Sequence, residues 1–76
     1  MEAKEIVARD PDILSGVLCF TGTRVPAQSL IDHLKAGESL DDFLEGFPSV
    51  NREQAEAFLE FAFRSAVIEV DHARAA

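Results

Sequence analysis

The chain has 76 residues, of which 47% are hydrophobic, and its formal net charge at pH 7 is −7. This length allows one domain, residues 1–76, with enough apolar side chains for a core, and the acidic balance favours basic partners over nucleic acid. A single cysteine excludes an internal disulfide, and no apolar run is long enough to span a membrane. Because no signal-peptide pattern follows Met1, we expect a soluble cytoplasmic protein.

Residues 5–26 are predicted to form short strands joined by turns. Residues 5–8 are a weak strand candidate, and the apolar residues 17–20 form a second strand. Gly22 then reverses the chain, so residues 24–25 are expected to return as the second arm of a small hairpin. A two-stranded hairpin is not stable alone, and it must pack on helices or on another subunit.

Three helices are predicted over residues 27–70. Pro26 suits the first position of a helix, and Gly37 suits the position directly after its end. Ser39 and Asn51 are placed as N-caps of the second and third helices. The predicted class is therefore mainly α: a short N-terminal β-hairpin followed by a three-helix, homeodomain-like (helix-turn-helix-like) unit.

The last helix, expected from residue 52 to near residue 70 and followed by a frayed tail at residues 71–76, is apolar on nearly all sides. One stripe at helical spacing is expected to face the core: Ala55, Phe58, Leu59, Ala62 and Ala66. A domain of this size cannot cover the remaining apolar residues, so something else must cover them. We expect a partner or dimer interface, although an apolar flank covered by the hairpin is the alternative. The expected interface is Phe61, Phe63, Arg64, Val67 and Ile68.

Polar residues give little indication of chemistry. His33 has no second ligand at helical spacing and is expected at the boundary of the core, and Cys19 is expected to be a buried thiol. Asp41 and Asp42 lie in the first turn of the second predicted helix, where their negative charge interacts favourably with the positive end of the helix dipole. They are therefore assigned to a solvated face rather than to a cation site. No catalytic residue, metal ligand, cofactor site or small-molecule substrate is predicted, and we expect a protein that is not an enzyme.

Arg24 lies between a tight turn and the proline that starts a helix. Its guanidinium can bond backbone carbonyls or a carboxylate of the last helix, and this structural role is favoured. Contact with a partner or a phosphate is the alternative.

Three helices also suggest a DNA-binding domain, in which the last helix enters the groove. Residues 27–70 contain three basic and nine acidic side chains, a net charge of −6. Phosphate contacts dominate DNA affinity, and this surface repels phosphate. DNA binding is therefore expected only together with a partner that supplies positive charge.

The order of residues resembles one bacterial family. The resemblance is carried by Asp10-Pro11, Gly16, Phe20-Thr21-Gly22-Thr23-Arg24-Val25-Pro26, Gly37, Ser39-Leu40-Asp41-Asp42-Phe43-Leu44 and Phe47-Pro48. In these positions the chain resembles the bacterial domain-of-unknown-function family 433, an antitoxin-like group with a homeodomain-like fold. It departs from the family at residues 16–18, where a lysine is usual, and at Ala27.

The resemblance implies a small antitoxin, the partner of a toxin with a PIN-like ribonuclease domain. It implies no catalytic residue, and it gives Gly22, Thr23, Arg24 and Pro26 a structural role. Two functions therefore stay open. The first is an interaction protein that forms a homodimer, a complex with the toxin, or both, through the last helix; the second is a DNA-binding transcriptional regulator.

Overall fold

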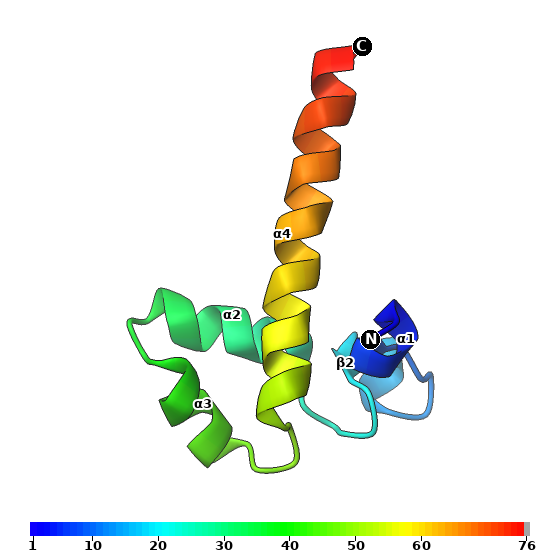
Figure 1. Ribbon diagram of the computed structural model, residues 1–76. Coiled ribbons are helices and arrows are strands. Elements are labelled where there is room, and N and C mark those ends of the chain that lie inside the picture. The colour runs from blue at the N-terminus through cyan, green and yellow to red at the C-terminus, as the bar shows by residue number, and fades with distance from the viewer. Residues whose placement is uncertain (76) are drawn as a thin grey trace.

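The computed structural model describes the backbone of residues 1–75 and the side chains of residues 1–73. The elements in chain order are α1 (Ala3–Ile6), β1 (Val7–Ala8), the 3-10 turn η1 (Leu14–Gly16), β2 (Cys19–Phe20), α2 (Ala27–Lys35), α3 (Leu40–Gly46) and α4 (Arg52–Ala75). The predicted class is confirmed, because a short antiparallel strand pair precedes three longer helices. Figure 1 shows α2 and α3 on one side of the lower half of α4, with α1 and β2 on the other.

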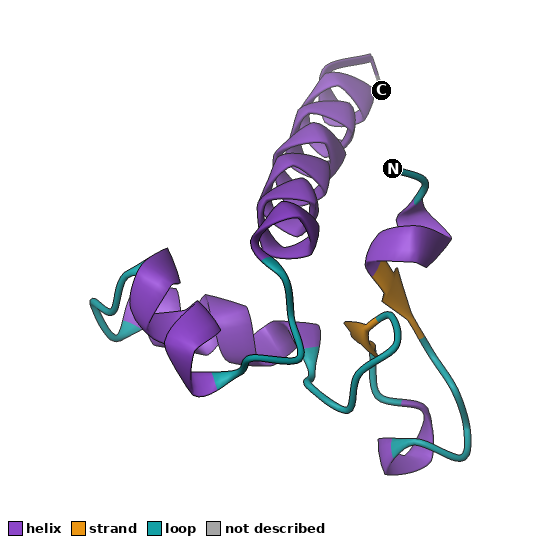
Figure 2. Ribbon diagram, turned by 60° about the horizontal axis from the view of Figure 1, so that its bottom comes forward, coloured by secondary structure: helices purple, strands orange, loops and turns teal. Residues whose placement is uncertain are grey.

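The strand pair differs from the predicted hairpin. β1 pairs with β2 in antiparallel register, Val7 with Phe20 and Ala8 with Cys19 (Figure 2). Residues 24–25 were expected to be the second arm, but β2 has only a single bridge on that side, between Cys19 and Pro26. The Phe20 N–H donates to the Val25 carbonyl and the Ala27 N–H to the Leu18 carbonyl, both at 2.9 Å. Pairing stops there because the Val25 N–H donates to the Thr23 hydroxyl and α2 begins at Ala27.

Each of the three longer helices begins or ends where local chemistry specifies it. The Ser39 hydroxyl accepts a hydrogen bond from the Asp42 N–H at 3.0 Å, and the Asn51 side-chain oxygen accepts one from the Gln54 N–H at 2.7 Å. Gly37 has a φ of 88°, the left-handed conformation that ends α2. The predicted caps of both helices and the predicted end of the first helix are thus confirmed.

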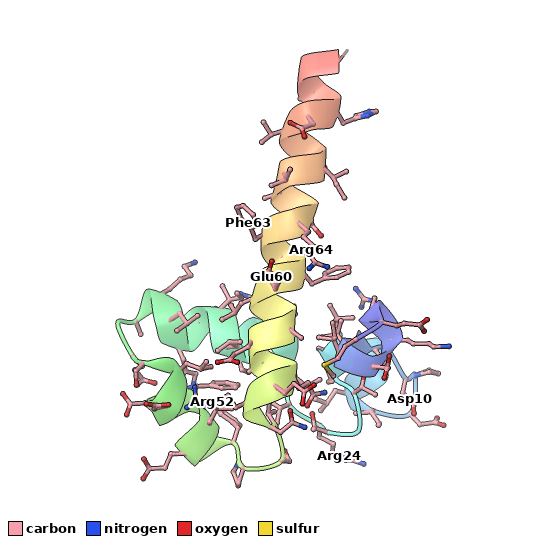
Figure 3. All side chains as sticks on the ribbon, in the orientation of Figure 1. Asp10, Arg24, Arg52, Glu60, Phe63 and Arg64 are labelled. Carbon is pink, nitrogen blue, oxygen red and sulfur yellow. The ribbon has the colours of Figure 1, made fainter. Side chains whose placement is uncertain are left out.

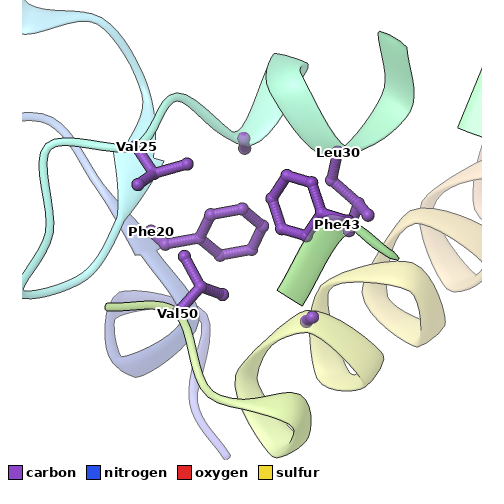
Figure 4. Packing of buried hydrophobic residues seen from close by; sticks show 7 residues of the cluster. Phe20, Val25, Leu30, Phe43 and Val50 are labelled. Atoms are coloured by element: carbon purple, nitrogen blue, oxygen red, sulfur yellow. The ribbon is translucent and has the colours of Figure 1, made fainter. Parts of the chain in front are cut away.

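The core joins the strand pair to all three longer helices. Phe20 of β2, Leu30 of α2 and Phe43 of α3 are completely buried, and Figure 4 shows them converging. The Phe20 ring lies 6.2 Å from the Phe43 ring and 5.6 Å from that of Phe58 in α4, measured between centroids. Such tilted and edge-on aromatic pairs add stabilisation beyond the area that they bury. Val50, in the loop before α4, completes this side of the core.

α4 continues well beyond the core. Leu59 is the last of its residues that is even partly buried, and residues 60–73 are all exposed. The predicted core positions Ala62 and Ala66 were therefore wrong, because their stripe extends above the elements that would cover it (Figure 1). α4 runs to Ala75, beyond the helix end predicted near residue 70, and residue 76 of the predicted frayed tail lies outside the described residues. We call residues 60–75 the projecting segment and residues 1–59 the base.

Candidate interaction surface

The five residues expected at a partner or dimer interface all lie on the projecting segment, and all are exposed. Exposed fractions of 65% for Phe63 and 69% for Ile68 are unusual for such large apolar side chains. The five residues do not form one patch. At about 100° of rotation per residue, Phe61 and Phe63 point about 160° apart around the helix axis.

One apolar face, the Phe63 face, consists of Phe63, Ala66, Val67 and Val70. These residues and Asp71 line a shallow, open depression in which apolar surface far exceeds polar surface. Figure 3 shows Phe63 extending from the helix above the level of α2. No residue of the base lines this depression, so the Phe63 face is uncovered within the described chain.

The other apolar face, the Phe61 face, consists of Ala57, Phe61 and Ile68. Phe61 and Ile68 are seven residues apart and therefore lie nearly above one another. At its lower end this face borders a hollow between α1 and α4, lined by Met1, Ile6, Ala57, Glu60, Phe61 and Arg64. The Phe61 face thus combines a helix stripe with a concave entry at the base.

A charged ridge separates the two faces on one side of the helix. The Arg64 Nε lies 3.8 Å from a Glu60 carboxylate oxygen, one helical turn earlier (Figure 3). Both side chains are well exposed, so this pair contributes little to stability. Because Arg64 is central in the ridge, it can reach a partner docked on either face.

Gln54 is a buried polar residue that the sequence analysis did not identify. It is 4% exposed, and its Nε2 donates hydrogen bonds of 3.0 Å to the carbonyl oxygens of Ile6 and Thr21. The side chain therefore connects α4 to the end of α1 and to the chain after β2. Gln54 precedes Phe58 by four residues and Phe61 by seven, so it lies on the same side of the helix as these apolar side chains. This spacing was the only signal in the sequence that Gln54 could be buried.

The turn after β2 is held by Thr23 rather than by Arg24. The Thr23 hydroxyl donates to the Phe20 carbonyl at 2.8 Å and accepts from the Val25 N–H at 3.0 Å, while Gly22 has a φ of 79°. Arg24 was expected to brace the turn. Among the side chains that the structure describes, its guanidinium forms no hydrogen bond or ion pair, and it extends into solvent at the lower edge of the molecule (Figure 3).

His33 and Cys19 lie where the sequence placed them. The His33 ring is half-buried, edge-on to Phe43 and Phe47 at centroid distances of 5.5 and 5.4 Å, with Nδ1 against a Glu38 carboxylate oxygen. Cys19 is a buried free thiol. Both residues are parts of the packing of the base.

A hollow outside the projecting segment lies beside β2. It has a volume of about 370 Å³, and its walls come from residues 8–10, Ile13, Val17 and residues 19–23. Its only charged lining residues are Arg9 and Asp10, and the Arg9 guanidinium is already bonded to the Gly16 carbonyl at 2.9 Å. Within the described residues no three His, Cys, Asp or Glu side chains are grouped as metal ligands, and no helix is long and apolar enough to cross a membrane.

Comparison with known proteins identifies the family. A protein of Sinorhizobium fredii (strain NBRC 101917 / NGR234), named "Uncharacterized protein y4eO", is 42% identical over 52 residues. That match covers 68% of this chain but 24% of the relative, so the chain spans about a quarter of its length. No solved structure matches the chain. The model of the family described as "Protein of unknown function (DUF433)" matches residues 7–62, nearly all of the base, and the chain therefore belongs to this family.

Proposed function

We propose that the chain is a non-enzymatic interaction protein, the antitoxin of a toxin with a PIN-like ribonuclease domain, which it binds through α4. The observation that carries this proposal is the projecting segment. It presents large apolar side chains on two faces, and neither face is covered within the described chain. Burial of such a side chain contributes about 1.5–3 kcal/mol, so two or three of them supply a docking site.

The Phe61 face fits a foreign protein better than the Phe63 face does. Its hollow between α1 and α4 is concave, and a concave entry beside an apolar stripe can receive a side chain of the partner. Arg64 and Glu60 at its border supply polar contacts at the rim. We assign Phe61, Arg64 and Ile68 to the toxin contact.

Charge supports a nuclease as the partner. A ribonuclease must present positive charge to the RNA backbone, and this chain has a net charge of −7. Opposite charges steer the two proteins together and favour occlusion of the basic RNA-binding surface. The same acidity disfavours DNA binding by the chain alone. Regulation of its own promoter is therefore proposed only for the complex with the toxin.

The first test is the gene beside the one for this chain, which we expect to encode a PIN-like nuclease. The second is RNA cleavage by that nuclease, measured with and without the purified chain. We expect stoichiometric inhibition, at least tenfold weaker inhibition by Phe61→Asp with Ile68→Asp, and full inhibition by Val17→Asp. Val17 is a matched control because it is 43% exposed, against 42% for Phe61, and belongs to the base, between η1 and β2. Cleavage that the chain leaves unchanged, or equal loss with both variants, would contradict the proposal.

A promoter gel shift at low salt, with the chain alone and with the complex, tests the regulatory role separately. We expect a shift with the complex only. A salt-sensitive shift by the chain alone would instead favour the DNA-binding regulator, because the proposal gives the chain no phosphate-binding surface.

A further inference from the structure

The Phe63 face has a regular spacing that the Phe61 face lacks. A line of residues along this face, extended to Leu59 below it and Ala73 above it, alternates at intervals of four and three: Leu59, Phe63, Ala66, Val70 and Ala73. This is the a and d spacing of helices that pair along a seam. Val67 lies beside this line. Within the projecting segment size alternates with it: Phe63 and Val70 occupy one set of positions, and Ala66 and Ala73 occupy the other. Leu59 shares the alanine set but belongs to the base.

We propose that two copies of this chain pair through their Phe63 faces, with the two α4 helices antiparallel. Antiparallel pairing places each a position opposite a d position. Phe63 of each copy then packs on Ala73 of the other, and Val70 packs on Ala66. Every layer of the seam contains one large and one small side chain, so two helices at a constant separation fill it evenly.

Parallel pairing fits the same residues poorly. It would place Phe63 opposite Phe63 and Ala66 opposite Ala66, so a wide layer would follow a narrow one. Straight helices separated far enough for the Phe63 layer would be too far apart for the alanines to make contact, so the alanine layer would contain a void. The alternation of sizes thus selects the orientation.

The distribution of charge favours the same orientation. Of the net charge of −7, the base carries −6, and residues 60–76 carry −1 from three acidic and two basic side chains. The surface that pairs is therefore nearly neutral. Antiparallel helices hold the two acidic bases at opposite ends of the pair, whereas parallel helices would bring them together. The repulsion that remains is screened by salt, so association tightens as salt is raised.

The length of the projecting segment leaves room for this arrangement. The register is fixed by Phe63 of one copy lying opposite Ala73 of the other. In that register Leu59 of the second copy, at the upper end of its base, lies level with a point just beyond Ala75 of the first copy. The two bases therefore do not overlap along the axis of the pair. The Phe61 face points away from the seam, so the dimer does not depend on the proposed toxin contact, and either can fail without the other.

The first test is sedimentation equilibrium of the isolated chain over a range of about 1 μM to 1 mM, in which weak interfaces of small area dissociate. We expect a monomer–dimer equilibrium. Val70→Asp should weaken it at least tenfold, and Ile68→Asp should change it less than about threefold, because one buried charge replaces an apolar contact only in the first variant. Both side chains are β-branched and more than half exposed. A monomer throughout the range, or equal effects of the two variants, would overturn the proposal.

The second test fixes the orientation by disulfide cross-linking. Ala66→Cys and Val70→Cys are purified separately with tags of different mass and then oxidised alone or mixed. Opposed seam positions have the Cβ separation that a disulfide needs. We expect a cross-link between the two variants only in the mixture. Cross-linking of each variant with itself would show parallel pairing and overturn the antiparallel assignment. The wild-type chain controls for Cys19, which is buried.

Discussion

The base and the projecting segment are both rich in apolar residues, but many of these residues are buried in the base, whereas those of the projecting segment up to residue 73 are exposed. Phe20, Phe43 and Leu30 of the base are completely buried, whereas Phe63, Ile68 and Val70 of the projecting segment are more than half exposed. Periodicity does not cause the difference, because α4 follows one helical pattern through both regions. The cause is length: α4 continues where α2, α3 and the strand pair end (Figure 1).

The match to the family separates the two regions at nearly the same place. It covers residues 7–62 and ends just above the last partly buried residue, Leu59. Within the base, apolar side chains are needed for folding. In the projecting segment the residues up to 73 are all exposed, and we propose that association explains their place on the surface.

The largest expected effect is the loss of unfolding free energy in a Phe43→Ala variant, compared with that in a Phe63→Ala variant. Loss of the completely buried Phe43 ring removes transfer free energy and leaves a cavity, which costs about 3–5 kcal/mol of unfolding free energy. A domain of this size has only about 4–11 kcal/mol in total. The exposed Phe63 should change the unfolding free energy of the monomer by less than about 0.5 kcal/mol. Urea unfolding of both variants at low protein concentration measures the difference, and equal losses would show that the projecting segment is part of the folded core.

A smaller effect is expected at the contact that ties α4 to the N-terminal elements. Gln54→Ala removes both hydrogen bonds to the Ile6 and Thr21 carbonyl oxygens, which should cost about 1–3 kcal/mol because buried acceptors lose their donor. Gln28→Ala is the matched control, since Gln28 is an exposed glutamine bonded to Asp32 at 3.0 Å. It should cost less than about 0.5 kcal/mol. Urea unfolding compares the two, and similar losses would mean that the buried amide does not tie the elements together.

Much of the base was predictable because its signals are local. Ser39, Asn51 and Gly37 each act on backbone groups within a few residues, so the helix ends follow from the sequence without knowledge of packing. The partner of β2 was not predictable in the same way. Residues 7–8 and 24–25 both flank it in the fold. The second side is limited to a single bridge because the Val25 N–H donates to the Thr23 hydroxyl, a contact that the sequence pattern does not show.

The sequence predicted which apolar residues form the candidate surface, but not how far up α4 the base covers the helix. An excess of apolar residues in the last helix is visible in the sequence, and the exposure of Phe61, Phe63, Val67 and Ile68 follows from it. Periodicity alone assigned Ala62 and Ala66 to the core, because a helical wheel shows direction but not how far the neighbouring elements reach. Gln54 was missed for a related reason: its partners are carbonyl oxygens 33 and 48 residues away in the chain.

The smallest expected effect on stability is that of a truncation, which tests whether the base folds without the projecting segment. Removal of residues 63–76 should change the unfolding free energy of the monomer by less than about 1 kcal/mol, because none of the described side chains removed is buried. The same truncation should abolish dimerisation, since it removes Phe63, Ala66 and Val70 together. Urea unfolding at low concentration and sedimentation equilibrium at high concentration measure the two properties on one protein. A truncated chain that is folded but monomeric would separate folding from association, whereas one that fails to fold would show that the base depends on the projecting segment.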